Sequence, residues 1–87
     1  MNEYPMNSND YTYRTNDLSQ AVALVVHGFL VRDIERVAYG NKAVFIFNRS
    51  KKLDTALSQY WADKLLVNPK SYFDAMKHLK TRIYSEA

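Results

Sequence analysis

The residues best suited to bind a ligand are cations at the start of an expected helix. Arg49, Lys51 and Lys52 surround Ser50, a residue type that commonly caps helix N-termini. Free backbone N–H groups and the macrodipole make this end of a helix positive, so acidic residues usually stand there. Three cations at such a place indicate room for an anion such as a phosphate. They are equally consistent with an ordinary solvated surface.

Further residues extend this candidate nucleic-acid-binding site. Lys70 stands at the start of another expected helix, and Lys77 lies on the same side of it seven residues on. Tyr11 and Tyr13 alternate on an expected strand, from which aromatic rings can stack on bases. We therefore expect weak, sequence-tolerant binding of DNA or RNA. The residues expected to bind it are Arg49, Lys51, Lys52, Lys70, Lys77, Tyr11 and Tyr13.

The distribution of charge along the chain is compatible with a polyanionic partner. The formal net charge is +3 over 87 residues. Residues 49–87 hold eight basic and four acidic residues, whereas residues 1–48 hold four basic and five acidic ones. The excess of positive charge therefore belongs to the second half, which also carries the basic cluster.

Patterns that would indicate catalysis or metal binding are weak. Asp74 and His78 share a helical face, but two ligands make no closed metal site, so an exposed pair is expected. Asp33 and Glu35 share a strand face, which is more typical of a solubilising edge than of an acid–base pair. His27 lies near a helix C-terminus and is expected to be a surface or capping residue. With no cysteine, thiol chemistry is excluded. We expect a non-enzymatic domain without a cofactor.

Hydrophobic periodicity predicts six elements that would position these residues. They are a strand at 11–15, a helix at 18–27, a β-hairpin at 29–47, and helices that begin after Ser50 and at Pro69. Gly40-Asn41 is the expected hairpin turn. Residues 43–47 are apolar on both faces, which is typical of a central strand, so we expect the first strand to pair with them. The predicted fold is α+β, a small three-stranded sheet with three packed helices in the order β-α-β-β-α-α.

Capping signals define the ends of the predicted helices. Asp17 is expected to cap the first helix, with Gln20 completing a capping box, and Gly28 is expected to close it in a left-handed conformation. Asn68 and Pro69 form a typical start for the last helix.

Length and composition predict one domain. Residues 1–10 are expected to be a mobile polar N-terminal tail, and residues 11–87 a single compact α+β domain. No apolar run approaches the roughly 20 residues needed to cross a bilayer. The first residues do not resemble a secretory signal. We therefore expect a cytoplasmic protein with no membrane partner.

A set of landmark residues carries a resemblance to a known family. They are Tyr13-Arg14-Thr15-Asn16-Asp17-Leu18, Gly28-Phe29, Val44-Phe45-Ile46-Phe47, Tyr60-Trp61, Asn68-Pro69-Lys70-Ser71-Tyr72-Phe73-Asp74-Ala75 and Leu79-Lys80. With these, about residues 11–84 resemble a small uncharacterised domain family (a domain of unknown function) of prokaryotes and their viruses or mobile elements. The family defines no catalytic residue, so the resemblance implies an independent domain in a viral or mobile-element context and no activity. The family leads one to expect a glycine soon after Tyr60-Trp61. Because Ala62-Asp63-Lys64 stands there instead, we expect this loop to differ.

The alternative function is a protein-interaction module, an adaptor or inhibitor that docks on another protein or on a second copy of the chain. If all three helices cover one face of the sheet, either Val44 and Ile46 or Phe45 and Phe47 lie on the uncovered face. An apolar face of that kind favours a partner, and Trp61 would enrich the contact. If the first helix covers the other face, no such surface exists. The two phenylalanines are expected in the core rather than against bases.

Overall fold

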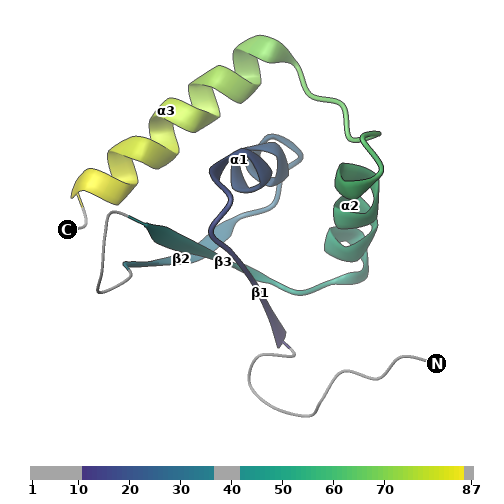
Figure 1. The fold of residues 1–87 in the computed structure, drawn as a ribbon, viewed down its shortest axis with the longest axis horizontal. Helices are drawn as coiled ribbons and strands as arrows, with labels where there is room; N and C mark the ends of the chain where they lie inside the picture. Colours follow the sequence, from purple (N-terminus) through teal and green to yellow (C-terminus); the bar gives the residue numbers. More distant parts are fainter. Residues whose placement is uncertain (1–10, 37–41, 86–87) are drawn as a thin grey trace.

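The described part of the chain forms six elements in the order predicted from the sequence (Figure 1). The structure is a computed structural model, and it describes residues 11–36 and 42–85. The elements are β1 (Thr12–Thr15), α1 (Leu18–Val26), β2 (Val31–Arg36), β3 (Ala43–Asn48), α2 (Lys51–Trp61) and α3 (Pro69–Ser85). This arrangement confirms the α+β fold. The expected tail at residues 1–10 and the expected turn at Gly40-Asn41 lie outside the described residues.

The sheet has β3 in its centre, in the strand order β1-β3-β2, and both pairs are antiparallel. Phe47 stands opposite Tyr13 of β1, and Phe45 stands opposite Ile34 of β2. The prediction that the first strand pairs with the apolar arm of the hairpin is therefore confirmed. An apolar strand in the middle of the sheet has both of its backbone edges hydrogen-bonded, which leaves the more polar β1 and β2 at the edges.

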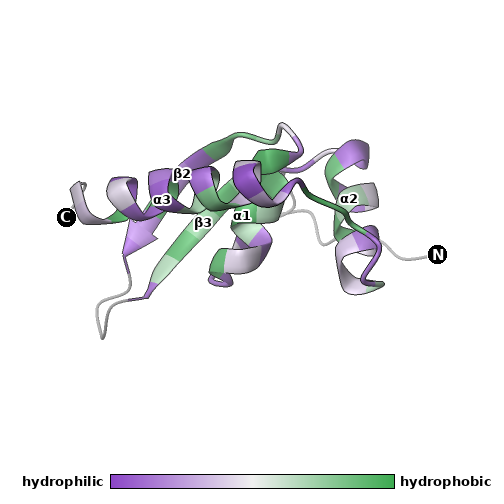
Figure 2. Cartoon of the chain, turned by 90° about the horizontal axis from the view of Figure 1, so that it is seen from above, coloured by the Kyte–Doolittle hydropathy of each residue, from purple (hydrophilic) through white to green (hydrophobic). Residues whose placement is uncertain are grey.

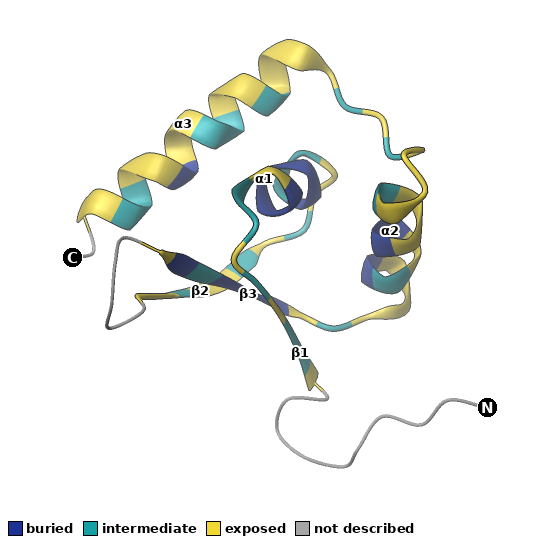
Figure 3. Cartoon of the chain, viewed as in Figure 1, coloured by how far each residue is buried: buried dark blue, intermediate teal, exposed yellow. Residues whose placement is uncertain are grey.

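All three helices lie on one face of the sheet, with α1 between α2 and α3 (Figure 1). Figure 2 shows β3 as a predominantly hydrophobic strand beneath them. The buried core draws on β3 and on every helix (Figure 3). Its members are Ala21, Val22, Leu24, Ala43, Phe45, Phe47, Leu53, Ala56, Leu57 and Leu79. The prediction that both phenylalanines belong to the core is confirmed, and burial explains why α1 tolerates valines that disfavour helices by themselves.

The opposite face of the sheet carries Val44 and Ile46, and no helix among the residues that the structure describes covers it. The alternative in which the first helix covers this face is therefore wrong. Ile46 is nevertheless only 6% exposed. Arg14 lies opposite Ile46 on β1 and Glu35 lies opposite Val44 on β2. These two side chains form an ion pair across the central strand, so their stems shield the apolar residues beneath.

The start of α1 differs in one detail from the predicted capping box. The Asp17 carboxylate accepts hydrogen bonds from the backbone N–H groups of Ser19 (3.0 Å) and Gln20 (3.3 Å), as expected of an N-cap. The Gln20 side chain does not return to the Asp17 N–H, which donates to the Thr15 hydroxyl at 3.1 Å. Gln20 is 1% exposed, and its Oε1 accepts from the Tyr13 hydroxyl at 2.8 Å. The expected capping role of Gln20 is wrong because a tertiary hydrogen bond takes its side chain into the core.

The first helix ends in a Schellman motif built on Gly28. The Gly28 N–H donates to the Val25 carbonyl at 2.9 Å, and the Phe29 N–H donates to the Leu24 carbonyl at 3.1 Å. Gly28 has a φ of +96°, which confirms the predicted left-handed closing residue.

The second helix ends in the same motif, built on an aspartate. The Asp63 N–H donates to the Tyr60 carbonyl at 3.1 Å, and the Lys64 N–H donates to the Gln59 carbonyl at 2.8 Å. Asp63 has a φ of +61°, the left-handed conformation that glycine adopts without strain. The loop therefore keeps the geometry of a glycine-closed helix at a position where the sequence has no glycine.

Replacing Asp63 by glycine is expected to stabilise the protein. Asp63→Gly removes the strain of the left-handed conformation and is expected to raise the free energy of unfolding by about 0.5 kcal/mol, net of the flexibility glycine adds to the unfolded chain. The matched control, Ala62→Gly, lies one residue earlier at a φ of −88° and is expected to lower it by about 0.5–1 kcal/mol. Urea unfolding followed by circular dichroism measures both. Equal losses in the two variants would contradict the assigned conformation of Asp63.

Candidate nucleic-acid interface

A groove of about 310 Å³ lies between β1 and α2. The residues that line it are Tyr13, Arg49, Asp54, Leu57, Ser58 and Trp61. The Arg49 N–H donates to the Tyr11 carbonyl at 2.9 Å, which continues the pairing of β1 and β3 by one step. This hydrogen bond fixes the beginning of β1 beside the beginning of α2, so Tyr11 and Arg49 belong to the same end of the molecule.

Arg49 forms part of the groove wall. Its guanidinium carbon lies 5.7 Å from the centroid of the Tyr13 ring, within the range of a cation–π contact. Its Nε lies 3.4 Å from the Asp54 carboxylate, which is an ion pair rather than a well-formed hydrogen bond. Asp54 is the acidic residue in the first turn of α2. The charge of Arg49 is therefore partly balanced within the protein. Its guanidinium is held against Tyr13 and Asp54 and forms part of the surface of the groove.

Tyr13 is also held by the fold. Its hydroxyl donates to the buried Gln20, and one face of its ring meets Arg49. Burial raises the pKa of the Tyr13 hydroxyl above its ordinary value, and the Gln20 hydrogen bond and the Arg49 charge act in the opposite direction. Tyr11, by contrast, is 65% exposed. Of the two predicted stacking residues, Tyr11 has the more accessible ring, and Tyr13 shapes the groove.

Trp61 adds an aromatic ring that the sequence analysis assigned to a protein contact instead. It lines the groove and is 68% exposed. Its ring meets Tyr60 edge to face, with centroids 5.2 Å apart and an angle of 82°. Asp54, Ser58 and Trp61 are spaced at i, i+4 and i+7, so they share one helical face. That spacing was the signal that could have placed Trp61 beside the basic cluster.

Lys51 and Lys52 are exposed in the first turn of α2. The Ser50 hydroxyl accepts from the Leu53 N–H at 3.0 Å, which confirms Ser50 as the N-cap. Neither lysine forms an ion pair with any other residue in the described part of the chain. Five of the predicted residues therefore gather around the β1 and α2 end of the molecule. They are Tyr11, Tyr13, Arg49, Lys51 and Lys52.

Lys70 and Lys77 lie elsewhere, on α3. The Lys70 ammonium pairs with Asp74 at 3.0 Å, and the Lys77 ammonium lies 5.1 Å from the centroid of the Phe73 ring. The whole length of α2 and the connection at residues 62–68 separate this surface from Lys51, and α3 then runs away from α2 along α1 (Figure 1). The seven predicted residues thus divide into two groups because α3 packs on α1 rather than beside the start of α2.

The other chemically suggestive residues lie at the surface. Asp74 is exposed and paired with Lys70, and His78 is exposed. His27 caps the end of α1, and its Nε2 lies 2.7 Å from the Leu66 carbonyl, which ties that end to the connection before α3. Within residues 11–36 and 42–85, no three potential ligands come together as a metal site would require. No helix among these residues is long and apolar enough to span a bilayer.

Comparison with known proteins gives a family without an assigned activity. The sequence model of the family described as "Domain of unknown function (DUF5659)" matches residues 10–85. The chain belongs to this family. The resemblance to an uncharacterised domain family is therefore confirmed over almost the same residues. No curated protein and no solved structure matches this DUF5659 domain.

The buried hydrogen bond between Tyr13 and Gln20 is expected to stabilise this DUF5659 domain. Tyr13→Phe leaves the Gln20 carbonyl oxygen unpaired in the core, where among the described residues its amide nitrogen already has no hydrogen-bond partner. We expect a loss of about 1–3 kcal/mol in the free energy of unfolding. Tyr11→Phe, at an exposed ring, is the control and is expected to change little. Restoration of stability in the double variant Tyr13→Phe/Gln20→Met would support the assignment, and equal effects of the two single variants would refute it.

Asp17 is expected to make stability depend on pH. The Ser19 hydroxyl is the largest of several hydrogen-bond donors that lower the pKa of Asp17 below its ordinary value, with the Gln20 N–H and the Tyr60 hydroxyl acting in the same direction. A lowered folded-state pKa stabilises the fold above the unfolded pKa, and that contribution is lost as pH falls through the folded value. The free energy of unfolding should therefore decline below about pH 4. Asp17→Asn should flatten this decline, whereas the exposed control Asp33→Asn should keep it; equal slopes would exclude Asp17 as the source.

Proposed function

We propose that this DUF5659 domain binds single-stranded nucleic acid, weakly and with little sequence preference, along the groove between β1 and α2. One observation carries the proposal: exposed aromatic rings and exposed ammonium groups follow one path, from the start of α2 beside β1, along the groove, to the last residue of α2. Tyr11 is 65% exposed and lies at the start of α2, where Lys51 and Lys52 are also exposed; Trp61, the last residue of α2, is 68% exposed and lines the groove. Stacking platforms next to phosphate-binding cations are the combination that sequence-tolerant binders of single strands use.

Each component of the groove has a separate task in this proposal. Lys51 and Lys52 meet phosphates, assisted by the positive end of α2. Trp61 and Tyr11 stack on bases. Arg49 holds the Tyr13 ring in the wall of the groove. Because Asp54 partly balances its charge, Arg49 attracts phosphates less than its place in the basic cluster predicts. The role is non-enzymatic and needs no cofactor.

A single strand suits the groove better than a duplex. Rings that stack on bases need bases that are already unstacked, which a duplex does not offer without distortion. The π faces of the bases and the phosphates are common to DNA and RNA, so the proposed contacts do not select between them. A viral or mobile-element context, which the family resemblance implies, is compatible with such a role.

Protein docking is the second candidate, and its supporting residues lie away from the sheet face. Leu30 is 85% exposed and Leu66 is 81% exposed. His27 brings the Leu66 backbone to the end of α1, three residues before Leu30, so both leucines surround this end of the helix. The open sheet face is less suited to dock a partner, because the ion pair above it keeps Ile46 buried. Absence of any association with single-stranded nucleic acid at low salt would favour this second candidate.

Binding is expected to depend on salt through the lysines of α2. Fluorescence anisotropy of labelled oligo(dT) and oligo(U) measures the affinity at several salt concentrations. We expect log affinity to fall linearly with log salt, and Lys51→Gln/Lys52→Gln to reduce the slope by about 1.4, at about 0.7 for each phosphate lost. Trp61→Ala is expected to weaken binding by about 1–3 kcal/mol without changing the slope.

The double variant Lys70→Gln/Lys77→Gln is the matched control. It removes the same charge from the distant surface of α3, so the slope should stay close to that of the wild type. Equal losses in the two double variants would show attraction by net charge alone, and absence of association at low salt would reject nucleic-acid binding altogether.

A further inference from the structure

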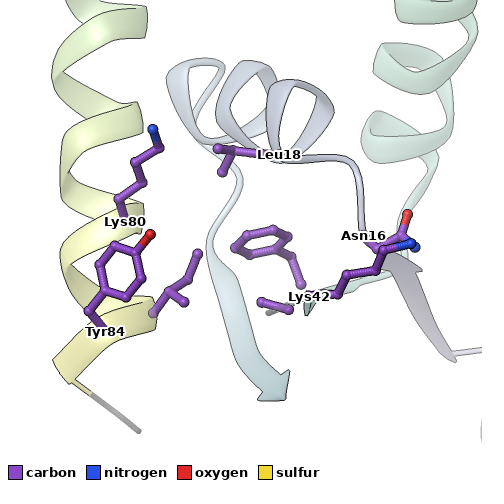
Figure 4. A pocket seen from close by; sticks show the side chains of 8 residues that line it. Asn16, Leu18, Lys42, Lys80 and Tyr84 are labelled. Carbon is purple, nitrogen blue, oxygen red and sulfur yellow. The ribbon is translucent and has the colours of Figure 1, made fainter. Parts of the chain in front are cut away.

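A second concave site lies on the other side of α1, where β3, α1 and α3 meet. It is a cleft of about 250 Å³. The residues that line it are Asn16, Leu18, Lys42, Ala43, Phe45, Lys80, Ile83 and Tyr84 (Figure 4). None of them lines the groove between β1 and α2. The cleft therefore needs an explanation separate from the proposed nucleic-acid site.

The inner surface of the cleft is apolar. Phe45 and Ala43 belong to the buried core, and Leu18 and Ile83 pack against that core from α1 and α3. An apolar group that enters the cleft and displaces water from these side chains removes apolar surface from water, which is favourable. A hydrocarbon or aromatic portion of a ligand would supply that group.

The rim of the cleft is cationic. Lys80 extends from α3 on one side of the cleft, where Tyr84 also lies, and Lys42 extends on the opposite side toward Asn16, so the two ammonium groups point away from each other (Figure 4). Neither ammonium group forms an ion pair with another residue in the two described ranges. The rim therefore presents two unbalanced positive charges together with two neutral hydrogen-bonding groups.

Among residues 11–36 and 42–85, the acidic residues next to Asn16 and opposite Val44 in the sheet are engaged elsewhere. Asp17, next to Asn16, accepts from Ser19 and from Tyr60 on the α2 side of α1. Glu35 of β2 pairs with Arg14 on the open face of the sheet. Neither carboxylate lines the cleft, so neither is placed to neutralise its rim.

The walls of the cleft are held in place by the fold. Arg36, opposite Ala43 in the sheet, donates from its guanidinium to the Ile83 carbonyl at 2.6 Å. This bond ties the last turns of α3 to the edge of the sheet, where a cation also complements the negative end of the helix dipole. A site formed in the absence of ligand costs little ordering when the ligand enters.

We propose that this cleft binds a small amphipathic anion, a carboxylate with a short apolar chain such as a medium-chain fatty acid. The carboxylate would accept a charge-assisted hydrogen bond from one of the two ammonium groups at the rim, and the chain would enter toward Phe45. The volume equals about eight water molecules at roughly 30 Å³ each, below the roughly 300 Å³ of sites for drug-sized ligands. Only a short chain fits.

Nuclear magnetic resonance of the ¹⁵N-labelled full chain tests the proposal with octanoate as the probe. Saturable shifts of amide signals are expected around the cleft, at Leu18, Ala43 and Ile83. Octylamine has the same chain and the opposite charge, and it is expected to cause no saturable shift there because two ammonium groups repel it. Lys42→Gln/Lys80→Gln is expected to weaken octanoate binding by about tenfold or more.

The matched control is Lys52→Gln/Lys64→Gln, which removes two exposed lysines outside the cleft and is expected to bind octanoate as the wild type does. All four lysines are exposed, and the spectra report directly that each variant is folded. Octanoate shifts that spread over the surface without saturation would overturn the proposal, as would equal binding of octylamine or an unchanged affinity of Lys42→Gln/Lys80→Gln.

Discussion

The packing of α1 against the inner face of β3 is the contact on which the rest of the structure depends. Residues 20–24 of α1 are all buried, and Phe45 and Phe47 are the largest side chains beneath them. Complete burial of a large apolar side chain contributes about 1.5–3 kcal/mol, and a chain without cysteine has no disulfide to add to that. Because α2 and α3 flank α1, the two concave surfaces lie apart: the cleft borders α1 and α3, and the groove lies between β1 and α2.

On the open face of the sheet, side chains of the edge strands cover the apolar residues in place of a helix. Arg14 and Glu35 reach across β3 from the two edge strands and leave Ile46 almost inaccessible. An exposed ion pair contributes little to stability, because water screens its charges. Its larger effect is to keep the apolar centre of the sheet from meeting another sheet.

Most of the fold could be predicted because its signals are local. Helical periodicity, the caps Asp17 and Ser50, and the closing Gly28 each depend on a few neighbouring residues. The central place of β3 followed from apolar residues on both of its faces. The predicted role of Gln20 was wrong because the orientation of its side chain depends on a hydrogen bond from Tyr13, seven residues away, and not on the helix start to which Gln20 belongs.

The candidate site was predictable only where strand pairing or a shared helix brings its residues together. Tyr11 and Arg49 follow from the register of β1 and β3. The separation of Lys70 and Lys77 from Lys51 depends on the direction that α3 takes after residues 62–68, which no local pattern specifies. The packing of α3 on α1 is a contact between residues far apart in the sequence, so local patterns do not predict it.

The exposure of Trp61 has an optical consequence. It is the chain's single tryptophan, and two thirds of its surface already meets water in the native state. Denaturation will therefore change its surroundings little, so indole emission is a poor monitor of unfolding in this protein. Because the ring is exposed, its emission will change when a ligand or partner covers it. Binding at this surface can therefore be followed without a chemical label.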